Sequence, residues 1–185
     1  SEAKLKTVLN SVGIGIALIS PDMRILSLNR QMQELRTLSR AIESSSVSVV
    51  ITDPKGVIEY INPKFSEVTG YSSQEVIGMK PGILKSGKLS DSFYKDLWST
   101  IYAGRQWRGE FINKKKNGEF YWESALISPI YNDQGELSNF VAVKEDITEQ
   151  KQIQTALLSS MAKYRTLFTA SGDAILLIEN NRYVE

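Results

Sequence analysis

The 185-residue sequence contains no cysteine and no histidine. Without cysteine the chain cannot form disulfides, thiolate nucleophiles, cysteine metal sites or a covalent adduct between a cysteine and a flavin. Without histidine it lacks imidazole catalysis, histidine-ligated haem and a histidine that accepts a phosphoryl group. Few catalytic mechanisms survive both absences, and we expect neither a catalytic residue nor a metal site in this chain.

Strong charge and long apolar runs are also missing. The formal net charge is +1, whereas binding to nucleic acid normally needs a basic patch. The best apolar run, Ile14 to Ile19, is far too short to span a membrane, and the N-terminus lacks the cleavage pattern of a signal peptide. With 42% hydrophobic and 23% charged residues the composition is that of a globular protein. We therefore expect a cytoplasmic chain without nucleic-acid partners, whose parent protein could carry a membrane anchor elsewhere.

The most informative stretch that is present runs from Trp98 to Glu123, where two aromatic-rich segments flank Asn117-Gly118. Asn-Gly between alternating segments is a strong signal for a β-hairpin. Because side chains alternate between the two faces of a strand, Arg108, Glu110 and Ile112 are predicted to lie on one face and a second set of residues on the opposite face. That set is Trp107, Gly109, Phe111 and Asn113. Such a face suits a hydrophobic core or the wall of a small-molecule pocket.

The remaining pattern predicts an α+β domain. Asn62-Pro63 and Ser90-Asp91 are typical helix starts, and Gly70 and Gly104 are typical helix ends. Turn sequences separate β-branched or aromatic runs in the rest of the domain. The expected strands cover residues 47–52, 57–61, 106–115, 119–130 and 137–143.

Two helices are expected to flank this domain. Residues 36–43 form the first, and Asp146-Ile147-Thr148-Glu149 predicts a capping box that begins the second. Beyond that box an apolar stripe follows a heptad-like spacing, which fits either a short coiled coil or a helix packed on its own domain. Two heptads do not decide between them. The stripe consists of Ile153, Leu157, Tyr164 and Leu167.

An internal repeat indicates the domain organisation. Residues 175–185 align without gaps on residues 49–59, and residues 16–29 align on residues 49–62. We interpret the chain as one complete domain between two partial copies. The predicted order is a partial domain at 1–35, a linker helix at 36–46, a complete domain at 47–147, a linker helix at 148–170 and the start of a further domain at 171–185.

Several motifs in order resemble the PAS family, ending in the PAC motif. They include Asn62-Pro63, Thr69-Gly70-Tyr71-Ser72, Trp107-Arg108-Gly109, Ser128-Pro129-Ile130 and Asp146-Ile147-Thr148-Glu149, and the resemblance covers about Arg40 to Lys151. It implies a PAS fold with a five-stranded antiparallel sheet, helices on one face, and flanking N- and C-terminal signalling helices. The closing motif implies that Asp146 and Thr148 transmit a signal to the second flanking helix.

Within that family a set of residues resembles the FAD-binding PAS domains of the nitrogen-fixation regulatory flavoprotein and of aerotaxis receptors. The set is Ile83-Leu84-Lys85-Ser86-Gly87, Tyr94, Trp98, Trp107, Gly109 and Asn113. The likeness implies non-covalent FAD, with Trp107 packed near the isoalloxazine and Asn113 hydrogen-bonded to its polar edge. Trp98 and Asn62 would line the same cavity. The sequence departs from the aerotaxis receptors at residues 85–88, where those proteins carry a basic loop that contains histidine.

Plainer interpretations stand beside these. The aromatic residues fill a core, and Asn113 satisfies a backbone group. Glu110 and Glu123 do not form a catalytic pair, because Glu110 faces away from Trp107 and no nucleophile accompanies them.

The function expected from the whole sequence is a sensory module of a larger signalling protein. The parent is predicted to be a sensor histidine kinase or a cyclic-dinucleotide enzyme, and this part, lacking such a domain, is expected to have no activity of its own. It would sense a small molecule or a redox state and dimerise through its flanking helices. The alternative is a ligand-free module for dimerisation and interaction.

Overall fold

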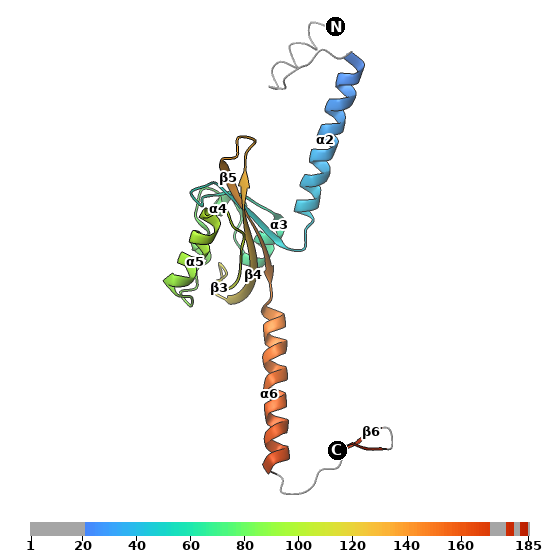
Figure 1. Ribbon diagram of the computed structural model, residues 1–185, viewed down its shortest axis with the longest axis vertical. Coiled ribbons are helices and arrows are strands. Elements are labelled where there is room, and N and C mark those ends of the chain that lie inside the picture. Colours follow the sequence, from blue (N-terminus) through green and yellow to red (C-terminus); the bar gives the residue numbers. More distant parts are fainter. Residues whose placement is uncertain (1–20, 171–176, 180–181, 185) are drawn as a thin grey trace. The chain divides into compact units, whose positions relative to one another are not determined.

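A computed structural model describes residues 21–170, 177–179 and 182–184 of the chain (Figure 1). The chain divides into two compact units, Ser1–Ile42 and Glu43–Glu185, and each is described by itself. The predicted partial domain at 1–35 lies largely outside the described residues. At the other end, β6 (Leu177–Glu179) and β7 (Arg182–Val184) pair as an antiparallel hairpin where the internal repeat predicts opening strands. That they begin a further domain stays a prediction.

The centre of the second unit is a five-stranded sheet in which every neighbouring pair is antiparallel, as the sequence predicts. The order across the sheet is β2-β1-β5-β4-β3, so the last strand of the domain lies in the middle and pairs with the first. Gly56, Gly118 and Gly135, all with positive φ, lie in the three hairpin turns where the turn sequences place them. The strands are β1 (Ser48–Thr52), β2 (Ile58–Ile61), β3 (Trp107–Lys114), β4 (Phe120–Tyr131) and β5 (Leu137–Asp146).

Four short helical segments cover one face of this sheet and form the core with it. Each contributes apolar side chains to a single buried cluster with the inward-facing residues of the strands. Asn62 and Ser90 cap the first and last of them through side-chain oxygens, as their positions in the sequence indicate. The segments are α3 (Pro63–Thr69), α4 (Ser73–Val76), the 3₁₀ helix η1 (Pro81–Leu84) and α5 (Asp91–Tyr102).

The alternation predicted for β3 is confirmed. Trp107, Phe111 and Asn113 are buried, whereas Arg108 and Glu110 are exposed. The glycine of this face has a packing reason, because the Trp107 ring lies over Gly109. A Cβ atom at Gly109 would lie 2.5 Å from Trp107 Cζ2, so a larger residue there would displace the indole.

The first flanking helix is longer than predicted, whereas the second covers the predicted residues 148–170. α2 spans Pro21–Glu43, and α6 spans Thr148–Ala170 and continues from the end of β5 (Figure 1). α2 therefore includes residues 21–29, which the internal repeat aligns with a strand hairpin. A helix, with Pro21 at its start, replaces the hairpin there.

Asn62 joins the first strand to the first helix of the domain. Its Oδ1 accepts hydrogen bonds from Val49 N at 2.8 Å and Phe65 N at 3.2 Å, and its Nδ2 donates to Val47 O at 2.9 Å. The residue is almost completely buried. Its amide therefore satisfies three backbone groups, two of them in buried hydrogen bonds.

We expect Asn62→Ala to lower the free energy of unfolding by about 2–4 kcal/mol, because buried backbone groups lose their partners. Urea unfolding followed by circular dichroism measures this loss. Gln154→Ala on the exposed surface of α6 is the control, and its free energy of unfolding should stay within about 0.5 kcal/mol of that of the unsubstituted chain. Equal stabilities for the two variants would contradict a structural role for Asn62.

Candidate functional site

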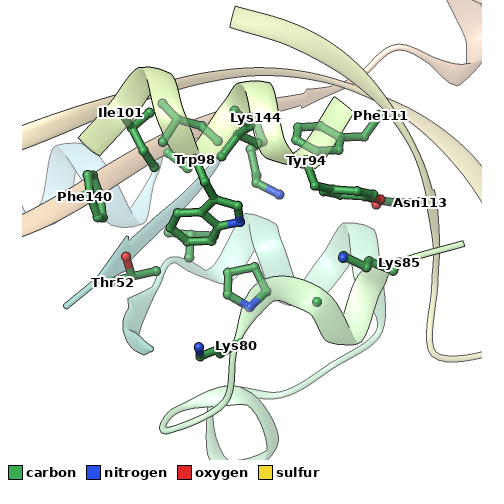
Figure 2. Close-up of a pocket in the computed structure, with 16 residues that line it drawn as sticks. Thr52, Lys80, Lys85, Tyr94, Trp98, Ile101, Phe111, Asn113, Phe140 and Lys144 are labelled. Carbon is green, nitrogen blue, oxygen red and sulfur yellow. The ribbon is translucent and has the colours of Figure 1, made fainter. Parts of the chain in front are cut away.

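A cavity of about 200 Å³ lies between the inner face of the sheet and the helical segments η1 and α5 (Figure 2). Strands β1, β3, β4 and β5 supply one wall and α5 supplies the other. Lys80, Pro81, Gly82 and Lys85, at and around η1, complete the lining. The cavity thus lies between the two layers of the domain, where the inner face of the sheet meets the helical segments.

One end of the cavity is apolar. Trp98 and Phe140 meet edge to face, with ring centroids 6.2 Å apart, and Ile101 lies beside them in the lining. The indole of Trp98 fits because Gly56 has no side chain: a Cβ there would lie 2.6 Å from Trp98 Cη2. The turn between β1 and β2 therefore helps to position a wall of the cavity.

The other end is polar and is organised by a buried carboxylate. Glu123 on β4 is 1% exposed and its Oε2 accepts hydrogen bonds from Lys144 Nζ at 2.7 Å and from Asn113 Nδ2 at 3.0 Å. Its Oε1 accepts a hydrogen bond from the Tyr121 hydroxyl at 3.1 Å. Lys144, 7% exposed, and Asn113 both line the cavity. Burial, and then the charge of Glu123, raise the pKa of Tyr121, which keeps its hydroxyl a donor.

Tyr94 on α5 adds an unused donor to this end. Its hydroxyl oxygen is buried and has no hydrogen-bond partner among the described residues. Burial raises the pKa of Tyr94, so the phenol stays protonated at neutral pH. The Lys85 ammonium lies 3.8 Å from the centre of its ring, and Lys85 also forms a β-bridge with Asn113. Buried polar groups nearly always have partners, so the Tyr94 hydroxyl is an unused donor in a residue that lines the cavity.

The structure separates the four residues expected to bind a cofactor. Trp98 and Asn113 line the cavity, at its apolar and its polar end respectively. Trp107 does not: its Nε1 donates to Asp96 Oδ2 at 2.9 Å, and its ring packs against Phe93. Asn62 also lies outside the lining and serves the backbone contacts described above. A cofactor role for these residues stays a prediction.

Sequence reasoning missed Glu123 and Lys144 as parts of the site; Tyr94 belongs to the residues that resemble the FAD-binding PAS domains, but no role of its own was predicted for it. The signal was available, because the alternation in β4 and β5 places Glu123 and Lys144 on the face that is covered by helices. Opposite charges on one inward face suggest a buried ion pair. Glu123 was instead weighed only against Glu110, which is exposed and pairs with Lys151 at 2.7 Å.

The junction between β5 and α6 is tied to β4 by hydrogen bonds. Trp122 N donates to Thr148 Oγ1 at 2.9 Å, and Ile147 N donates to Trp122 O at 2.9 Å. The Thr148 hydroxyl in turn donates to Asp146 Oδ1 at 2.5 Å, and Thr148 N donates to the same oxygen at 2.9 Å. The predicted capping arrangement differs in detail. The helix begins at Thr148, so the Asp146 carboxylate binds the N–H of Thr148, two residues on, and not that of Glu149.

FAD, which the family resemblance implies, does not fit the cavity in this structure. Pockets that enclose a drug-sized ligand have volumes of about 300–1,000 Å³. The cavity has about 200 Å³, and FAD is larger than such ligands. Trp107, expected beside the flavin ring, lies outside the lining. The polar wall contains Lys144, whose ammonium is paired with Glu123. The described residues also contain no group of acidic side chains that could hold a metal ion.

Comparison with known proteins supports the same family as the geometry. A family model for the PAS domain matches residues 46–149. The chain is 29% identical over 138 residues to the nitrogen fixation regulatory protein of Klebsiella oxytoca, covering 75% of this chain and 28% of that protein. It is 28% identical over 133 residues to a blue-light-activated histidine kinase of Brucella anthropi, covering 70% of this chain and 27% of the kinase. The chain thus spans about a quarter of the length of these relatives.

A solved structure shows the fold independently. The PAS domain of a protein from Colwellia psychrerythraea superposes with a TM-score of 0.55 at 23% identity, covering 62% of this chain and 98% of that domain. In the described part of the chain no helix is long and apolar enough to cross a bilayer. Sheet order, helical cover, closing motif and family model agree, and the chain belongs to the PAS domain family.

Proposed function

We propose that this chain is the cytoplasmic sensory module of a larger signalling protein of the histidine kinase type, without catalytic activity of its own. It senses a small molecule or a redox state in the cavity and relays the change through α6. One observation carries this proposal: the polar end of the cavity and the start of α6 share the same two strands. Glu123 neighbours Trp122 on β4, and Lys144 precedes Asp146 on β5.

The relay follows from these contacts. A ligand that contacts Lys144 or Asn113 changes the hydrogen bonds of the Glu123 carboxylate, which both residues share. β4 and β5 are paired along their length, and Glu123 stands opposite Asp146. A shift between these strands acts directly on the hydrogen bond from Trp122 N to Thr148 Oγ1. The ligand then selects between two arrangements of the junction, and α6 transmits the difference.

The output of such a relay is proposed to be the packing of a homodimer through the flanking helices. The stripe residues Ile153, Leu157 and Tyr164 on α6 are each about 60% exposed, so they do not pack on their own domain. Leu35 and Leu38 on α2 are exposed in the same way. Apolar stripes of this spacing are buried when two copies of a helix form a coiled coil.

We expect Thr148→Val to abolish the response of the parent protein to its stimulus while the domain stays folded. Valine keeps the shape of threonine but can neither accept from Trp122 N nor donate to Asp146. The measurement is kinase output in cells with and without stimulus at equal protein levels. Thr155→Val is the matched control, because the Thr155 hydroxyl bonds only within α6. If the parent protein with Thr148→Val responds to stimulus like the parent protein without the substitution, the proposed relay is contradicted.

Leu157→Lys is expected to shift the purified chain from dimer to monomer, because a charge in a coiled-coil seam must be buried unpaired. Analytical ultracentrifugation over a range of concentrations measures the shift. Gln154→Lys places the same charge on the same helix outside the stripe and should leave the dimer intact. Identical behaviour of both variants would remove α6 from the interface.

Non-covalent FAD is the candidate occupant that the family resemblance supplies. Because the cavity volume of about 200 Å³ is too small for FAD, a bound flavin would require the cavity to widen. A blue absorption band that travels with the purified protein, and FAD in the denatured extract, would support it. Colourless folded protein with no small molecule in the extract would support the alternative, a ligand-free dimerisation module.

A further inference from the structure

We propose that the cavity binds a small organic carboxylate, with its acid group at the polar end beside Lys144 and Tyr94 and its apolar body against Trp98 and Phe140. The inference rests on the proposed function, in that it names the class of ligand sensed by the same site. Four observations point to this chemistry: the sign of the charges in the lining, the unused donors, the apolar end and the volume.

The charges that line the cavity all have one sign. They are Lys80, Lys85 and Lys144, and no acidic residue is among the described residues of the lining. Within the described part of the chain neither Lys80 nor Lys85 forms an ion pair. Glu123 neutralises Lys144 from behind and is not itself part of the lining. The field inside the cavity therefore favours an anion and opposes a cation.

The polar end offers donors that the protein does not use. The Tyr94 hydroxyl has no partner among the described residues, and the Lys144 ammonium, which carries three N–H groups, has one such partner in Glu123. Contacts join these groups in space: Lys85 lies over the Tyr94 ring, Tyr94 packs against Phe111, and the Lys144 ammonium lies 5.5 Å from the centre of the Phe111 ring. Figure 2 shows them toward one side of the cavity, with Phe140 and Ile101 toward the other. A carboxylate accepts several such hydrogen bonds and donates none, which matches this set.

The volume and the apolar end set the size of the ligand. The cavity volume is about 200 Å³. It is larger than the roughly 150 Å³ of an apolar cavity that holds benzene and smaller than the roughly 300 Å³ at which drug-sized pockets begin. The body of the ligand is therefore about one aromatic ring or a short branched chain. A single negative charge suits the site better than a phosphate dianion, because Lys144 is already paired and Lys80 and Lys85 are exposed to water.

The test uses matched probes against the purified 185-residue chain. Benzoate, benzamide and benzylamine share a ring and differ in charge, and isovalerate, isovaleramide and isoamylamine repeat the comparison with an aliphatic body. Titration followed by amide NMR shifts measures each affinity and shows which residues respond. We expect each acid to bind at least about tenfold more tightly than its amide, and the amines not to bind. Affinities that are equal within each series, no binding by any acid, or tighter binding of phenyl phosphate than of benzoate would overturn the proposal.

Variants assign the binding to the cavity. Tyr94→Phe should weaken benzoate about tenfold without affecting the fold, since it removes only a hydroxyl that has no partner within the protein. Tyr164→Phe, on the exposed surface of α6, is the matched control and should bind benzoate as tightly as the unsubstituted chain. Because loss of Lys144 alone would leave Glu123 unpaired, the double variant Glu123→Gln/Lys144→Met replaces both charges, and it should lose the preference for acid over amide. Unchanged binding by Tyr94→Phe would contradict the assignment.

The same experiment separates this inference from the proposed function. Ala142→Phe fills the cavity from β5, and in the parent protein it should abolish the response to stimulus. If it does so while no carboxylate binds, the cavity senses a ligand of another class and only the present inference fails. If the parent protein with Ala142→Phe responds normally to stimulus while benzoate binds the unsubstituted 185-residue chain, the site binds carboxylates but the sensory role fails.

Discussion

The Glu123 carboxylate is the constraint on which the rest of the domain depends. A charge that is 1% exposed is tolerated only when donors surround it, and its donors come from three strands. Asn113 on β3, Tyr121 on β4 and Lys144 on β5 all bond to it. A slip of one residue in the pairing of β4 with β3 or with β5 would turn Asn113 or Lys144 to the opposite face and remove one of the three donors. The carboxylate therefore fixes the register of the sheet at the end where α6 departs.

This arrangement gives one residue pair two roles. Lys144 and Asn113 are at once partners of Glu123 and walls of the cavity, so a ligand cannot contact them without changing the environment of a buried charge. In a medium of low dielectric such a change has a large energetic effect. The neighbouring residue Trp122 carries the backbone groups to which Ile147 and Thr148 attach. Sensing and transmission are adjacent because alternation in β4 turns Glu123 toward the core while the backbone of Trp122 remains available to the junction.

Much of the fold could be predicted from sequence because its signals are local. Turn residues, helix caps and period-two alternation place the five strands and the helices between them, and the motifs indicate the family. Local likeness also failed in one place: residues 16–29 resemble a strand hairpin, yet residues 21–29 are helical in α2. The alignment alone does not decide between the two elements, because a short apolar stretch is compatible with either a helix or a strand.

The candidate site was only half predictable. The sequence by itself determined which side chains face inward, because the alternation in a strand does not depend on what covers it. It could not determine which inward side chains border the cavity. Trp107 and Phe111 share a face, yet only Phe111 lines the cavity, because Trp107 folds over Gly109 and bonds to Asp96 on α5. The sequence indicated that Glu123 and Lys144 share the inward face, but not that their strands are neighbours in a register that lets them pair. Only the tertiary structure decides such pairings, because they depend on strand register and on how α5 packs across the sheet.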